Sequence, residues 1–494
     1  MKNFLKTDIF IYIILFGVCI FILLQSPLAP YAKSANGVDS SVFIYSAQQI
    51  LDGKIMYKDI VDHKGPFLYF INELALFIFN GKYIGIWIFE ILSLFATSVI
   101  MYKTARFFAD RLSSFFAVIT SILFLVPLLI GGNFTEEWAL PYISIAMYIF
   151  VSYLKKNKPL NIVRLFILSF TFVLTFMLRA NLVAIWGGFG VALLIKWIIE
   201  KNYKELTRNL LLIFMFVLLS LLPFFLYLYF QGALNDAIYL VFKYNMLEYH
   251  PKTKVAILRT GLDILLGKEV VFGEGAPLSI IPLIIAIYIF LRDKTIVNGG
   301  ILFAFAFTTL ACSLGFTFRY YFMIFSPILV IPYVYIYKVI KESIPKAKYI
   351  SLLILFVYYN FPPIRMQAWT IHQNYSEQGY GEFTISPPIM KELKEIIIKN
   401  TKSTDKILVK GNQATLYLYS GRICATRFPY ALQRSSLSEK YYVREAEDAL
   451  PKMIIQGKIA NSSWDTFNLD TLLNSRYQLL ATDIKNVEIW KLKE

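Results

Sequence analysis

The stretch 59–66, Asp59-Ile60-Val61-Asp62-His63-Lys64-Gly65-Pro66, places four ionisable side chains directly before an apolar run at 66–79. That run contains Asn72 and Glu73 and is shorter than the roughly 20 residues that a spanning helix needs. We therefore predict a helix that lies in the membrane interface. The preceding segment 42–51 has a similar amphipathic spacing, so we expect two interfacial helices around a polar turn.

The composition of the whole chain supports a membrane environment for this turn. Of its 494 residues, 57% are hydrophobic and 17% are charged. Soluble proteins average about 45–50% apolar and about 25% charged residues. A soluble chain could not bury this much apolar surface, so we predict a mainly α-helical, polytopic membrane protein.

Long apolar runs recur on both sides of the turn, and length alone predicts about eleven spans. The expected spans are 9–24, 83–102, 112–130, 138–154, 162–179, 181–199, 209–230, 277–291, 296–316, 319–338 and 349–361.

The distribution of basic residues predicts the orientation of these spans. The net charge of +16 is concentrated in short runs between apolar segments, such as 155–158, 201–208 and 338–348. Cytoplasmic loops have this composition, whereas a nucleic-acid-binding face would gather the same charge on one surface. We expect no nucleic-acid partner, a cell membrane location and a cytoplasmic N-terminus. The segments expected outside are 25–82, 131–137, 231–276 and 362–494.

Beyond residue 361 the apolar density falls and the charge rises. We divide the chain into a membrane domain, 1–361, and a small C-terminal extracytoplasmic α/β domain, 362–494. The expected elements of this domain are a helix at 391–399, strands at 406–410 and 422–426, and a short helix or strand at 416–420.

Charged residues near a bilayer tend to mark function, and the first outer loop is rich in them. Asp39 begins the first interfacial helix, where it serves either as a helix cap or as a base that accepts a proton from a hydroxyl. Lys64 lies at headgroup level, where it either snorkels to water or binds a lipid phosphate. Asp62 and His63 beside it have no second ligand pair that would indicate a metal site.

Two later loops carry further candidates. Glu136 and Glu137 stand together at the outer end of a span, where capping explains one carboxylate better than two. Arg179 and Arg319 lie at outer span ends, against the positive-inside trend, which indicates anion binding or snorkelling. Beside Arg319, two tyrosines fit either a site or the aromatic belt of a membrane protein; these are Tyr320 and Tyr321.

The order of these features resembles the GT-C membrane glycosyltransferases, in the branch of the protein O-mannosyltransferases and the bacterial aminoarabinose transferase of lipid A. The resemblance is carried by Asp39 after the first span, the segment 50–59, and the element 62–69 that opens the second interfacial helix. It covers about the first 200 residues in order and the general topology thereafter. The chain departs from the branch at Ser40, where relatives often have a second acid, and at Tyr320, where they often have histidine.

The resemblance implies a catalytic base at Asp39, a phosphate contact at Lys64 and an acidic partner at Glu136 or Glu137. It implies a polyprenyl-phosphate sugar as donor, a glycan, lipid or protein as acceptor, and inversion at the anomeric carbon. No cofactor is indicated for certain, and a divalent cation stays open.

Two other classes of protein share this composition. A transporter or flippase of lipid-linked glycans should show repeats and charges in the middle of its spans, and the sequence shows few such charges. A non-catalytic assembly subunit leaves the cluster at 59–66 unexplained. A glycosyltransferase is the interpretation that accounts for both observations.

Overall fold

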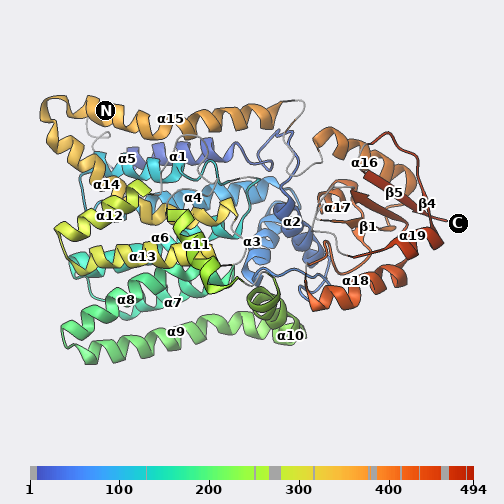
Figure 1. Cartoon of the computed structure of the whole chain (residues 1–494), viewed down its shortest axis with the longest axis horizontal. Coiled ribbons are helices and arrows are strands. Elements are labelled where there is room, and N and C mark those ends of the chain that lie inside the picture. The colour runs from blue at the N-terminus through green and yellow to red at the C-terminus, as the bar shows by residue number, and fades with distance from the viewer. Residues whose placement is uncertain are drawn as a thin grey trace.

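The computed structural model describes residues 8–129, 131–249, 252–265, 280–314, 318–376, 379, 386–411, 414–432, 434–457, 467–484 and 487–493. Long, roughly parallel helices form a bundle with the N-terminus at its far end, and a smaller domain that contains the sheet lies at the opposite end (Figure 1).

Every expected span falls on a helix of this bundle. The helices are α1 (Asp8–Leu23), α4 (Ile84–Ala105), α5 (Arg111–Leu123), α6 (Thr135–Lys156), α7 (Ile162–Phe176), α8 (Ala184–Ile199), α9 (Tyr203–Phe230), α12 (Ile280–Arg292), α13 (Ile296–Ser313), α14 (Ser326–Ser343) and α15 (Lys348–Tyr375). Short 3₁₀ turns, η1 (Ala180–Val183), η4 (Arg319–Phe325) and η5 (Pro345–Ala347), precede α8, α14 and α15.

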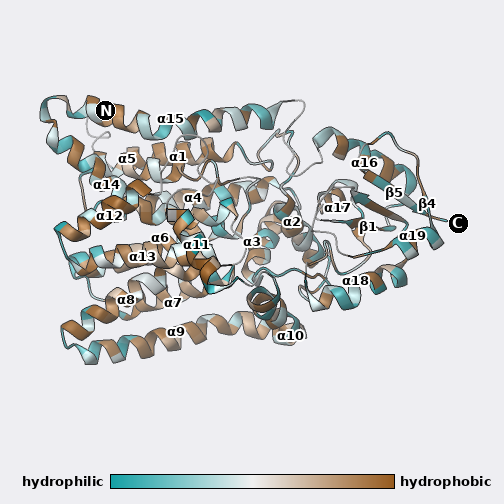
Figure 2. Ribbon diagram, viewed as in Figure 1, coloured by the Kyte–Doolittle hydropathy of each residue, from teal (hydrophilic) through white to brown (hydrophobic). Residues whose placement is uncertain are grey.

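In the described part of the chain, six helices are long and apolar enough to cross a membrane, and several shorter helices of the bundle are also apolar. The bundle is apolar along its length, whereas polar residues gather at its ends and over the C-terminal domain (Figure 2). Large apolar side chains on α9, among them Leu211, Phe214 and Leu218, are exposed. Such a surface is stable in lipid and not in water, which agrees with the predicted membrane location.

The helix limits differ from the expected ones in several places, and two of these differences are large. α5 ends at Leu123, before the expected limit at residue 130. α15 continues to Tyr375 with Pro362 and Pro363 inside it, so the expected boundary at residue 361 falls within a helix. Parts of three expected spans, at residues 130, 277–279 and 315–316, lie outside the described residues.

Both helices expected in the first outer loop are present, as α2 (Val38–Leu51) and α3 (Pro66–Ile78). They lie between the bundle and the C-terminal domain (Figure 1). α3 starts with proline at its first position, where the missing N–H costs nothing. Before it, Gly65 donates its N–H to the Leu178 carbonyl at 3.1 Å. A Cβ on Gly65 would lie 2.0 Å from the Met177 carbonyl oxygen, so only glycine fits this contact.

The connection from α9 to α12 also lies beside the first outer loop. It contains α10 (Leu234–Ile238), a π-helix, η2 (Tyr239–Glu248), and α11 (Lys254–Leu265). π-Helical turns are rare and often accompany functional sites, and Asn245 of this one reaches the turn at 59–66.

The C-terminal domain has a five-stranded sheet in the order β2-β1-β3-β5-β4. Its strands are β1 (Lys406–Lys410), β2 (Ile423–Cys424), β3 (Met453–Gly457), β4 (Tyr477–Leu479) and β5 (Val487–Leu492). β1 pairs in parallel with β2 and β3, while β5 runs antiparallel to β3 and β4. Helices α16 (Pro387–Asn400), α17 (Thr415–Ser420), α18 (Ser436–Ala449) and α19 (Asp470–Arg476) complete the domain, which is the small α/β unit that the sequence predicted.

Direct hydrogen bonds join this domain to the first outer loop. The Tyr45 hydroxyl of α2 accepts from the Cys424 N–H at 2.9 Å. Ser41 and Thr415 share a hydrogen bond of 2.6 Å between their hydroxyl groups. The Val61 N–H donates to the Arg427 carbonyl at 2.7 Å. The loop that carries the candidate residues is therefore held between bundle and domain.

Candidate functional site

Asp39 lies half-buried in the first turn of α2, where the helix dipole favours a negative charge. The Tyr320 hydroxyl donates to its Oδ2 at 3.3 Å. The ring of Tyr320 is stacked between two phenylalanines, with ring centroids 4.3 Å from Phe134 and 5.4 Å from Phe318. This stacking fixes the hydroxyl, so a residue 281 positions away orients the carboxylate.

Lys64 is held by its neighbour His63. Its Nζ lies 2.9 Å from His63 Nε2, and His63 Nδ1 lies 2.7 Å from Asn245 Oδ1. An amide oxygen only accepts, so Nδ1 carries the proton and Nε2 accepts from Lys64. Burial, followed by the Lys64 charge, lowers the pKa of His63 to about 3. A neutral imidazole thus orients a charged ammonium group that is itself half-buried.

Asp62 is completely buried and anchors the turn from within. Its carboxylate accepts from the Tyr69 hydroxyl at 2.5 Å, the Tyr430 hydroxyl at 2.7 Å and the His63 N–H at 2.6 Å. Burial acts to raise the pKa of Asp62, but the charge of Lys64 and the two tyrosine hydroxyl groups outweigh it, and the pKa is lowered. The carboxylate is ionised and its oxygens are occupied, which suits a structural anchor better than a substrate contact.

Arg179 joins the second outer loop to the start of η4. Its guanidinium donates to Glu136 Oε1 at 2.8 Å and to the Tyr321 hydroxyl at 2.5 Å. The guanidinium also lies over the Tyr321 ring, 4.0 Å from its centroid. Thr135 donates to the other oxygen of Glu136 at 2.7 Å. Glu136 and Arg179 are therefore each other's partners.

Glu137, the next residue, lies close enough to Glu90 on α4 for the two carboxyl groups to interact as like charges. It is buried, and in the described part of the chain neither of its carboxyl oxygens makes a hydrogen bond of good geometry, although the backbone N–H groups of Phe134 and Asn133 lie close enough to favour its charge. Glu90 accepts from the Asn133 N–H at 2.6 Å. Asn133 in turn pairs with Asn72 of α3 and donates to Ser40 at 3.3 Å. This buried polar layer supports the N-terminal end of α2.

Arg319 is exposed, and its guanidinium makes no ion pair or hydrogen bond with another described residue. Its neighbours Tyr320 and Tyr321 contact Asp39 and Arg179 respectively. The fold thus brings together most of the expected residues at the end of the bundle that faces the C-terminal domain. Asp62, His63 and Glu137 belong to the support beneath this end.

Sequence reasoning missed several residues of this arrangement. Asn245 holds His63 from 182 positions away, and Tyr430 holds Asp62 from 368 positions away. No local pattern marks either residue. Glu90 did carry a signal, because it is an acid inside the expected span 83–102.

A resident metal ion needs several ligands that converge. The described part of the chain contains no group of three or more histidine, cysteine, aspartate or glutamate side chains placed to hold one. Arg179 and Glu136 balance each other's charge, whereas Asp39 is hydrogen-bonded by the neutral hydroxyl of Tyr320.

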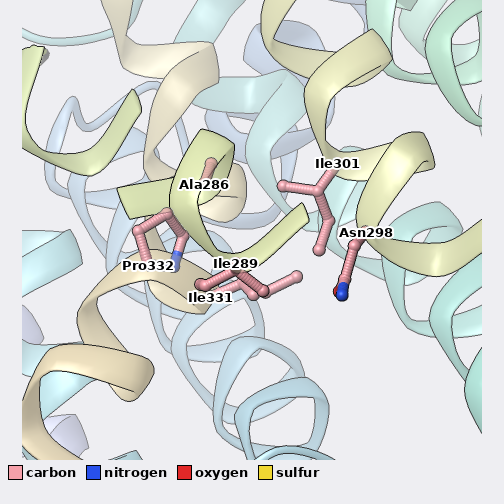
Figure 3. Close-up of a pocket in the computed structure, with 6 residues that line it drawn as sticks. All are labelled: Ala286, Ile289, Asn298, Ile301, Ile331 and Pro332. Carbon is pink, nitrogen blue, oxygen red and sulfur yellow. The ribbon is translucent and has the colours of Figure 1, made fainter. Parts of the chain in front are cut away.

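An apolar crevice between α12, α13 and α14 is not a second site. Figure 3 shows its lining of Ala286, Ile289, Asn298, Ile301, Ile331 and Pro332. The polar side chain among them, Asn298, donates to the Asp293 carbonyl at 2.8 Å. The crevice holds no space for a water-sized molecule.

Comparison with known proteins gives matches in structure alone. No family model and no characterised protein matches the sequence. ArnT from Cupriavidus metallidurans, solved bound to undecaprenyl phosphate, superposes with a TM-score of 0.66 at 9% identity, over 97% of both chains. The Archaeoglobus fulgidus oligosaccharyltransferase AglB, solved with an inhibitory peptide and a dolichol-phosphate, gives 0.58 at 11% identity, over 99% of this chain and 74% of that one. The same archaeal enzyme solved with Zn and sulfate gives 0.59 at 12% identity, over 98% and 73%.

Proposed function

Because the chain has the fold of the GT-C membrane glycosyltransferases, we propose that it transfers a sugar from a polyprenyl-phosphate donor to an extracytoplasmic acceptor. The observation that carries the proposal is the placement of two oriented groups at one end of the bundle. Asp39 accepts from Tyr320, and Lys64, held by His63, lies 6.0 Å from the ring centroid of Phe43, one turn along α2 from Asp39. One group takes a proton and the other binds an anion. Solved proteins of this fold bind undecaprenyl phosphate and a dolichol-phosphate, which supports a lipid-phosphate donor.

In the proposed reaction the acceptor hydroxyl attacks the anomeric carbon of the donor. Asp39 takes the hydroxyl proton as the new carbon–oxygen bond forms. The bond from the anomeric carbon to the phosphate oxygen breaks, and polyprenyl phosphate leaves with the electron pair. A single displacement of this kind inverts the anomeric centre.

Lys64 stabilises the charge that grows on the leaving phosphate. Of the two arginines considered from the sequence, Arg319 is the better second contact. Arg179 is already engaged by Glu136 and Tyr321, whereas Arg319 is exposed. Arg179 would act indirectly, by fixing the tyrosine pair beside Asp39.

The location and topology follow from the same proposal. The loop 25–82 and the C-terminal domain lie outside the cell membrane, and the N-terminus lies in the cytoplasm.

The test is complementation of a strain that lacks the protein, with mass spectrometry of its surface glycans. Asp39→Asn keeps the shape of the side chain but cannot accept the proton, so we expect the glycan product to fall at least about 100-fold. Asp52→Asn is the matched control, since Asp52 is an exposed carboxylate at the other end of α2. Near-normal product from Asp39→Asn would refute the assignment of the base.

A further inference from the structure

A polar cavity of about 300 Å³ lies where the first outer loop meets the C-terminal domain. Tyr45 and Gln49 of α2 form one wall, the loop 54–60 forms a second, and β1, β2 and the segment 425–429 form the third. The cavity is separate from the contacts of Asp39 and Lys64 described above, and the comparisons assign nothing to it.

The lining of this cavity is strongly cationic. It contains Lys54, Lys58, Lys406 and Arg427, with one acid, Asp59. Asp59 closes its own turn by accepting from the Ile55 N–H at 2.9 Å.

The three lysines differ from Arg427 in their partners. Arg427 is paired with Glu445 at 2.8 Å. For the lysines, no ion pair or hydrogen bond of the ammonium group is found among the described residues, and all three side chains are exposed. Like charges gathered around one cavity repel one another. An anion that enters the cavity removes this repulsion and gains charge-assisted hydrogen bonds.

The cavity is also placed to serve the reaction. Its wall residue Tyr45 is six residues along α2 from Asp39, which corresponds to about 9 Å along a helix, or the length of one to two sugar rings. At its floor, Arg427 accepts from the Val61 N–H through its carbonyl, next to the buried anchor Asp62. The residues of α2 between the two places, 40–47, are buried, so a glycan held at the cavity would have to reach Asp39 around the outside of this helix.

We propose that this cavity binds an acidic group, phosphate or carboxylate, of the glycan that accepts the sugar. The inference rests on the proposed function for its biological meaning, but its physical content is an anion site built from Lys54, Lys58 and Lys406. Lysine suits this task because it is a compact charge that does not demand one ligand geometry.

The test measures binding and transfer separately, on the full-length protein in nanodiscs. The probe is a soluble glycerol-phosphate oligomer, with a neutral oligosaccharide of similar length as comparison. For the Lys58→Gln/Lys406→Gln variant we expect the dissociation constant of the acidic probe to rise at least about tenfold. Lys394→Gln, an exposed lysine on α16 outside the cavity, is the control that should leave it unchanged.

Other results of the binding experiment would overturn the inference. Equal affinity for the neutral probe, or unchanged affinity in the double variant, would show that no anion site exists. Binding of vesicles that contain phosphatidylglycerol, without binding of the soluble oligomer, would assign the cavity to a lipid headgroup instead.

In the transfer assay the double variant should raise KM for an acidic acceptor and leave KM for the lipid donor unchanged. Absence of transfer by the unmodified protein would refute the proposed function, while the binding result would still stand.

Discussion

Two adjacent glutamates, Glu136 and Glu137, have opposite environments, and substitution of each by glutamine should separate them. Glu136 pairs with Arg179 at 2.8 Å, and the two side chains are 0% and 18% exposed. At this distance, with an effective dielectric constant of about 20, two unit charges attract by about 6 kcal/mol before the cost of desolvation. Removing one partner of a buried pair costs about 3–5 kcal/mol.

Glutamine retains an oxygen that can accept from Arg179, so we expect Glu136→Gln to cost about 3 kcal/mol, the lower end of this range. Glu137→Gln should cost less than about 1 kcal/mol or stabilise the protein, because a buried carboxyl that lacks a hydrogen bond of good geometry is itself unfavourable. Of the two variants, only Glu136→Gln should also lower the rate of sugar transfer. Its partner Arg179 fixes Tyr321, whose ring centroid lies 5.0 Å from that of Tyr320.

The assay is thermal unfolding of the purified variants in one detergent, with Arg179→Gln and the double variant Glu136→Gln/Arg179→Gln to complete a mutant cycle. We expect the double variant to lose less stability than the sum of the single losses. A Glu137→Gln variant as unstable as Glu136→Gln, or strictly additive losses in the cycle, would refute the pairing.

Three further predictions concern the turn and its surroundings. Burial and Lys64 lower the pKa of His63 from 6.5 to about 3, so between these pH values the unfolded chain binds a proton that the folded protein does not. The free energy of unfolding should therefore fall as pH drops through this window. In thermal unfolding, His63→Gln should make the stability depend less on pH over the same window. Gly65→Ala places a Cβ 2.0 Å from the Met177 carbonyl oxygen and should abolish monodisperse protein in size-exclusion chromatography, whereas Gly17→Ala, with nothing within 4 Å, should not. Asp52→Cys should react with a membrane-impermeant maleimide in intact cells, because residue 52 is exposed in the loop expected outside. The native Cys19, Cys312 and Cys424 are buried and should give little background labelling. Labelling only after permeabilisation would contradict the outer location of the loop.

The membrane bundle could be predicted from the sequence because apolar length and basic loops follow directly from the physics of a bilayer. The helices at 42–51 and 66–79 were also predicted, and both are confirmed as α2 and α3. The limit of α15 was not predicted, because the apolar density falls beyond residue 361 while the helix continues through Pro362 and Pro363 to Tyr375.

The candidate site could be predicted only in part. Asp39 and Lys64 follow from local pattern, as charges at a helix start and at a turn. The choice between Glu136 and Glu137 did not follow, since it depends on which carboxylate meets Arg179, 43 positions away. The same holds for His63, whose role is set by Asn245 in the π-helix. Tertiary contacts of this kind leave no trace in a single sequence.

The central claim is that the protein breaks the bond between a sugar and a lipid phosphate. The direct measurement uses proteoliposomes that contain the purified protein, a labelled polyprenyl-phosphate sugar and an extract of cell-envelope glycans as acceptor. We predict one free polyprenyl phosphate for each sugar transferred, and no transfer from a nucleotide sugar. Movement of the intact lipid-linked sugar across the bilayer, with no bond broken, would contradict the account and indicate a transporter.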